Sequence, residues 1–243
     1  MPRQPFLPFI LRNRGGEFKV GTHALRERPE LELLIANCLM AWTHTEAEMA
    51  LLLAHLLGVE QSEATLVVYH SLRRSSAQRD AISEAARYAL SDADQELLSA
   101  ILNAHKAVEA ERNALTHGHF GTYSLLTDGL VWMDTKSYID TRARMELAYQ
   151  VPNQEFLEKM YSKAYVYRAP DLDAIFGAIK DIGDIWDKFI VYLRVHATLP
   201  LAAGLYRQLC DRPRIARELA ILRQKNNPPT QPQSPSPTAN GKA

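Results

Sequence analysis

The spacing of apolar positions predicts a mainly α-helical chain. From Pro29 to Leu57 apolar residues recur at steps of three and four, as on one face of a helix, and Gly58 follows as a helix stop. A second amphipathic stretch, residues 62–90, has a break near Ser75-Ser76 and an outer face rich in arginine. The first half of the chain is therefore expected to begin with long helices.

A third helix is expected after Ser91, which makes a good N-cap because acidic residues follow it directly. This helix should end at Gly118, and its apolar stripe consists of Leu98, Ile101, His105, Val108, Arg112 and Leu115. A later helix is expected from Pro170-Asp171 to just before Pro200, with a broad apolar face typical of a core helix.

Between these helices the apolar period changes to that of a strand. Residues 121–134 alternate around Thr127-Asp128-Gly129, and this Asp-Gly pair predicts a β-hairpin with its turn there. Residues 145–149 and 164–167 are predicted as further short strands around a helical turn near Phe156-Leu157.

These elements divide the chain into four parts. Residues 1–28 form an N-terminal extension, and residues 29–198 a helical domain with a β-rich insertion at about 120–169. Residues 199–225 carry a basic helix. Residues 226–243 are rich in Pro, Gln, Ser, Asn and Thr, which predicts a disordered tail.

Composition limits the function classes. The 28 basic and 28 acidic residues cancel, so binding to nucleic acid must use a local patch. Cys38 and Cys210 alone cannot build a disulfide framework or a thiolate metal cluster, which fits a reducing compartment. No targeting segment is visible, and no apolar run approaches the roughly 20 residues that cross a bilayer. We expect a cytoplasmic protein without membrane spans.

One polar group of residues interrupts the third helix. Arg112 occupies a stripe position where Val108 and Leu115 favour a hydrophobe, so its charge needs a partner or a purpose. Asn113 follows it, and His117 stands near the helix C-terminus, where the dipole stabilises the imidazolium form. A proton-transferring imidazole and a cation for the transition state are the parts needed to cleave RNA without a metal.

The spacing of Arg112 and His117 raises a geometric problem. Five residues at about 100° each place the two side chains roughly 140° apart around an ideal helix. Either the helix end unwinds, or the site is composite, with both residues of two chains lining one cleft in a two-fold dimer.

The segment from Glu111 to Gly118 resembles the motif of the HEPN superfamily, whose α-helical domains carry Arg, four to six residues and His, often with Asn directly after the Arg. The context is similar, since Trp42 and Glu46 lie on the first helix and Leu56-Leu57-Gly58 closes it. The resemblance covers about residues 30–120 and the late helix from Asp171 to His196.

This resemblance implies an antiparallel helical bundle with the hairpin as an insertion, and a homodimer whose motif faces a shared cleft. It also implies metal-independent endoribonuclease activity, which many members use in toxin–antitoxin or antiviral systems, although several members are inactive scaffolds. The predicted partners are RNA, a second copy of the chain and an antitoxin or other protein. No cofactor is expected.

On this hypothesis His117 is the acid/base, Arg112 stabilises the transition state and Asn113 orients one of them, with Glu46 and His119 in support. The alternative is a non-catalytic HEPN-like interaction module, in which Arg112 forms a buried ion pair with Glu46 and His117 caps the helix. A metal site is disfavoured, because zinc needs three or four convergent ligands.

Other clusters point less clearly to function. Four arginines of the second helical stretch either follow an RNA backbone or form a solvated helix face, the usual role of such runs: Arg73, Arg74, Arg79 and Arg87. No nucleophile elbow and no phosphate-binding glycine loop occur, which disfavours serine hydrolases and nucleotide-triphosphate enzymes.

Overall fold

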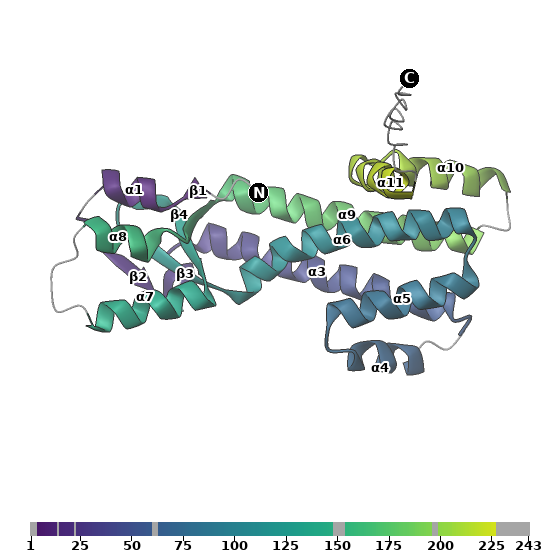
Figure 1. Cartoon of the computed structure of the whole chain (residues 1–243), viewed down its shortest axis with the longest axis horizontal. Coiled ribbons are helices and arrows are strands. Elements are labelled where there is room, and N and C mark those ends of the chain that lie inside the picture. Colours follow the sequence, from purple (N-terminus) through teal and green to yellow (C-terminus); the bar gives the residue numbers. More distant parts are fainter. Residues whose placement is uncertain are drawn as a thin grey trace, which may run out of the picture.

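A computed structural model describes residues 4–13, 15–21, 23–59, 63–147, 154–195 and 199–226. Most of these residues are helical, and a five-stranded antiparallel sheet lies at one end of the molecule (Figure 1). The predicted mainly α class is confirmed at this level. No helix of the described ranges is long and apolar enough to cross a membrane.

Three long helices run side by side along the long axis of the molecule (Figure 1): α3 (Pro29–Leu56), α6 (Asp92–His117) and α9 (Ala169–Val195). Each packs against the other two. Their apolar faces form one continuous core, which includes Trp42 and Trp186.

Shorter helices flank this core on two sides (Figure 1). On one side, α4 (Glu63–Ser71) packs against α3, and α5 (Ser75–Ala89) packs against α3 and α6. On the other side, α10 (Leu199–Cys210) packs on α9, and α11 (Pro213–Asn226) packs on α6. The predicted basic helix is confirmed as α11, whereas α10 has no counterpart in the sequence prediction.

The local signals at helix ends were correct. Pro29 lies in the first turn of α3, where its missing N–H is no loss, and Gly58 beyond its end has a φ of 65°, which favours glycine. Ser91 caps α6 by accepting a bond from the Asp94 N–H at 3.3 Å. The expected break in the second stretch separates α4 from α5.

The predicted hairpin is the centre of a larger sheet, with the order β1-β5-β4-β3-β2 and antiparallel pairing throughout. The strands are β1 (Gln4–Pro5), β2 (Phe18–Val20), β3 (Gly118–Tyr123), β4 (Leu126–Asp134) and β5 (Ala164–Arg168). Only β5 and the hairpin were predicted. The outer strands come from the N-terminal extension, together with the short helices α1 (Leu7–Arg12) and α2 (His23–Arg26).

The sheet separates two cores, because successive side chains of a strand point to opposite faces. Leu130 and Trp132 of β4 join the core of the long helices. Val131 and Met133 face a second core, built on α1, α7 (Thr135–Leu147) and α8 (Gln154–Tyr161).

The predicted position of the hairpin turn is wrong. The turn lies at Ser124-Leu125, with Leu125 half exposed and Leu126 buried at the start of β4. Asp128 and Gly129 are strand residues: Asp128 pairs with Arg168 at 2.8 Å, and Gly129 leaves room for the neighbouring strand β5. Glycine serves a close strand approach here rather than a turn.

Two further expectations concern the insertion and the chain end. The strand predicted for 145–149 is wrong over 145–147, which belong to α7, and residues 148–149 lie outside the described ranges. The helical turn near Phe156-Leu157 is part of α8. Asn226 closes α11; the rest of the predicted tail, 227–243, and His196 also lie outside the described ranges.

The end of α6 is attached to the sheet. The Trp132 indole N–H donates to the Ala114 carbonyl at 2.8 Å, and the Thr135 hydroxyl donates to the His117 carbonyl at 2.8 Å. Both carbonyls belong to the last turn, where intrahelical donors run out. α6 then continues into β3 at Gly118, whose backbone is extended at φ −98° and ψ 164°. This junction fixes where His117 stands.

Gly118→Ala should destabilise the protein because an added Cβ would lie 1.6 Å from the Trp132 indole nitrogen. We expect a loss of about 1–3 kcal/mol in urea unfolding, as for other overpacked sites. Gly204→Ala is the control, since nothing lies within 4 Å of its Cβ position in α10; alanine there should stabilise by up to about 1 kcal/mol. An unchanged Gly118→Ala protein would contradict this account of the junction.

Candidate functional site

Arg112 is held between α3 and α6 by three groups. Its guanidinium lies 4.8 Å from the centre of the Trp42 ring, donates to Glu46 Oε1 at 2.6 Å and donates to Asn113 Oδ1 at 3.0 Å. Trp42 also donates its indole N–H to the same Glu46 oxygen at 2.6 Å. The sequence identified both the motif and Glu46 as the natural partner of Arg112, and the structure brings them together.

The two members of this ion pair differ in exposure. The Arg112 side chain is 16% exposed and the Glu46 side chain 43%. The Arg112 Nε is buried with no hydrogen-bond partner among the described residues. Since a guanidinium has five N–H donors, Arg112 keeps donors beyond its bonds to Glu46 and Asn113. Of this ion pair, Glu46 is therefore the residue with the larger contact with solvent.

A buried imidazole lies behind Trp42. The ring centres of His105 and Trp42 are 4.7 Å apart, and the Trp186 indole N–H donates to His105 Nδ1 at 3.2 Å. Burial lowers the pKa of His105 to about 4, with Glu109 opposing the shift and two arginines adding to it. His105 is thus a neutral core residue that supports Trp42.

A second ion pair, between Arg79 of α5 and Glu109 of α6, was missed by the sequence analysis. Their side chains are 16% and 9% exposed, so Arg79 does not lie on a solvated outer face. The Tyr69 hydroxyl lies in the field of this pair, and it has no hydrogen-bond partner in the described part of the chain. Burial and the charge of Glu46 raise the pKa of Tyr69. The helical spacing of Arg79 with Ile82 was the available signal.

His117 stands apart from this cluster. α6 stays helical through His117, so its end does not unwind. The His117 side chain is exposed and makes no hydrogen bond with the described residues, whereas Arg112 faces α3. Within one chain, Arg112 and His117 do not converge on one point. The first of the two geometries that the sequence allowed, an unwound helix end, is therefore wrong.

His119 lies on β3, two residues beyond the helix end. Its ring stacks on Tyr138 of α7, with centres 4.1 Å apart and planes 19° from parallel. It contacts neither Arg112 nor Glu46 in any described interaction. No three His, Cys, Asp or Glu side chains of the described ranges are arranged to hold a metal ion.

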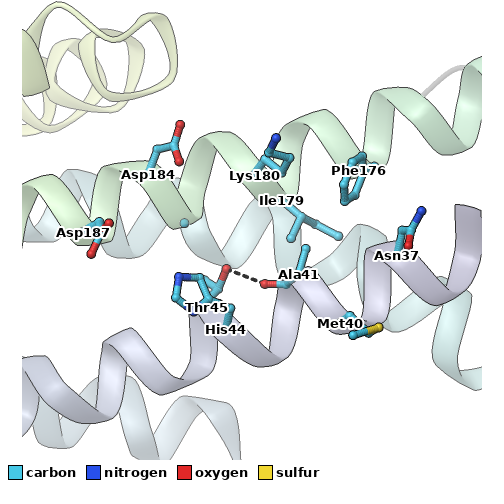
Figure 2. A pocket seen from close by; sticks show the side chains of 11 residues that line it. Asn37, Met40, Ala41, His44, Thr45, Phe176, Ile179, Lys180, Asp184 and Asp187 are labelled. Atoms are coloured by element: carbon cyan, nitrogen blue, oxygen red, sulfur yellow. Dashed lines mark hydrogen bonds between the residues drawn. The ribbon is translucent and has the colours of Figure 1, made fainter.

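A separate pocket of about 350 Å³ opens between α3 and α9 (Figure 2). Asn37 and His44 of α3 and Lys180 and Asp184 of α9 lie around it. None of the motif residues lines this pocket. The motif and the pocket are therefore distinct features.

Comparison of the chain with protein-family models, curated proteins and solved structures found no match. The case for function therefore depends on the residues themselves.

Exposure should govern the strength of the two ion pairs. In double-mutant cycles with Arg79→Met and Glu109→Gln, we expect a coupling free energy of roughly 2–3 kcal/mol, because both partners are buried. The matched cycle with Arg112→Met and Glu46→Gln should give about 1 kcal/mol or less, since solvent screens Glu46. Urea unfolding measures both. Equal couplings would contradict a difference set by burial.

His105 should make stability depend on pH. Its folded pKa of about 4 lies below the ordinary value of 6.5, so the unfolded chain binds the proton first as the pH falls. Unfolding free energy should therefore decline from about pH 6.5 to about pH 4. His105→Asn, which keeps an acceptor for Trp186, should show a shallower decline. Parallel curves for the two proteins would show that His105 does not titrate in this range.

Proposed function

We propose that this chain is an HEPN-like, metal-independent endoribonuclease that acts as a homodimer with a composite site. The observation that carries the proposal is a preoriented guanidinium at Arg112 combined with an exposed imidazole at His117, five residues later at the end of the same helix. Fixed donors aimed at developing charge are the largest single contribution in many enzymes.

Each residue has a distinct part in the reaction. His117 takes the proton of the RNA 2′-hydroxyl as that oxygen attacks the adjacent phosphorus, and the resulting imidazolium returns the proton to the departing 5′-oxygen. The N–H donors of Arg112 that are not bonded to Glu46 or Asn113 stabilise the charge on the phosphorane oxygens. Asn113 and Glu46 hold the guanidinium in orientation. The products are a 2′,3′-cyclic phosphate and a 5′-hydroxyl.

A second copy completes the site. Because Arg112 and His117 diverge around α6, the shared cleft of the dimer has two reaction centres, each with Arg112 from one protomer and His117 from the other. We extend the proposal to a toxin or defence role in the cytoplasm, with an antitoxin or other protein as regulator.

The rival function is a non-catalytic interaction module. One observation favours it: the Arg112 guanidinium already binds Glu46 and Asn113 and stacks on Trp42. In this rival, the exposed His117 is buried only in the interface with a second copy or another partner.

The test is cleavage of a mixed RNA pool by purified protein in EDTA. Wild type should produce fragments with cyclic-phosphate ends. Arg112→Ala and His117→Ala should each lower the rate at least a hundredfold. The control is His44→Ala, because His44 lies on the side of α3 that faces α9 and not Arg112. This variant should cleave RNA at the wild-type rate.

Mixing the two inactive variants tests the composite site. In a mixed dimer, one of the two reaction centres keeps both Arg112 and His117. Because random exchange makes half of the dimers mixed, it should restore about a quarter of wild-type activity. Absence of rescue in verified mixed dimers would reject the composite site. If a folded wild-type dimer leaves all RNA intact, and Arg112→Ala instead dissociates the dimer, the interaction module is the better account.

A further inference from the structure

His119 and Tyr138 stack on each other at the margin of the second core. Both rings are partly exposed, and neither makes a hydrogen bond with the described residues. Only Tyr138 packs at the margin of the second core. The pair therefore presents aromatic surface to solvent at the edge of the sheet.

This surface is close to the exposed imidazole of the motif. His119 follows His117 by two residues, with Gly118 between them. The Thr135 hydroxyl binds the His117 carbonyl, and Tyr138 lies one turn further along α7. Strand β3 and helix α7 thus place both rings beside the end of α6.

The charge around the pair suits a polyanion. Lys136 of α7 and Lys163, just before β5, are both exposed. Two acids lie beside or within the first two turns of α7. Asp140 is exposed, and Asp134 accepts bonds from the Ser137 N–H at 2.9 Å and from the Ser137 hydroxyl at 2.6 Å. Burial alone would raise the pKa of Asp134, but the Ser137 bonds and the charge of Lys163 lower it. Asp134 is thus engaged in capping α7, while both lysines face solvent.

We propose that His119 and Tyr138 form a nucleobase-stacking subsite, which binds one base of a single-stranded RNA next to the phosphate at which His117 acts as acid and base. This inference rests on the proposed ribonuclease function and adds Tyr138 as a substrate-binding residue. Aromatic rings bind bases with little sequence preference, since every base has a π face. Lys136 and Lys163 supply the local positive charge that a neutral chain otherwise lacks.

The test is a binding cycle that needs no cleavage. The probe is a fluorescent 2′-O-methyl RNA oligonucleotide, which has no free 2′-hydroxyl to attack, with an abasic residue moved through each position. Wild type should bind the probe about tenfold more weakly when one position is abasic. Tyr138→Leu should weaken binding of the intact probe by a similar factor and lose that sensitivity.

Matched variants separate stacking from folding. Tyr138→Phe keeps the ring and should bind the probe as wild type does. His119→Ala removes the other ring of the stack and should weaken binding as Tyr138→Leu does. Tyr88→Leu makes the same substitution at an exposed tyrosine of α5 and should leave binding unchanged. If Tyr138→Leu does not fold, His119→Ala provides the same cycle.

The outcomes distinguish this subsite from the proposed function. If Tyr138→Leu keeps full abasic sensitivity, or wild type shows none, the subsite is wrong even when wild type cleaves RNA. If the binding results are as expected but wild type cleaves no RNA in the mixed pool, the subsite is supported and the ribonuclease function is rejected. Absence of any binding to the probe would overturn both.

Discussion

The candidate site depends on Trp42 of α3, whose ring contacts the motif residue Arg112 of α6. One face of the indole lies under the Arg112 guanidinium, and the ring N–H holds Glu46. A buried cation is costly unless it is paired and hydrogen-bonded, and Trp42, Glu46 and Asn113 together meet that requirement. The register of α3 against α6 is therefore tied to the position of one guanidinium.

The sheet holds the other end of the motif, the backbone at His117. A helix end exposes carbonyls that need donors, and Trp132 and Thr135 of the insertion provide them. The long helices fix Arg112, while the sheet fixes the backbone of His117. Because these attachments are independent, the two side chains keep a fixed divergence around α6.

Local signals allowed accurate prediction, whereas non-local pairing did not. Ser91, Gly58 and the apolar stripes determine helix ends within a few residues, and Glu46 was identifiable because it interrupts such a stripe. Strands β1 and β2 contain two and three residues, too few for a period, and each pairs with a strand more than a hundred residues away. Gly129 led to a wrong turn prediction, because glycine is needed there for the close approach of strand β5 rather than for a turn. The Arg79–Glu109 pair joins two helices, and the spacing of Arg79 with Ile82 indicates that Arg79 is buried but not which acid it meets.

Comparison of the two ion pairs on α6 bears on whether Arg112 has a purpose beyond folding. Replacing a buried ion pair with hydrophobes is often neutral or stabilising, so structure alone is a weak reason to keep one. Arg79 and Glu109 are both enclosed, and no exchange of partner is open to them. Arg112 is equally enclosed, but its acid Glu46 is 43% exposed. On the proposed function, a phosphate would approach from this solvent-facing side and bind the N–H donors of Arg112 that Glu46 and Asn113 leave unused. The proposed phosphate contact requires such access beside Arg112, whereas an ion pair that only stabilises the fold does not.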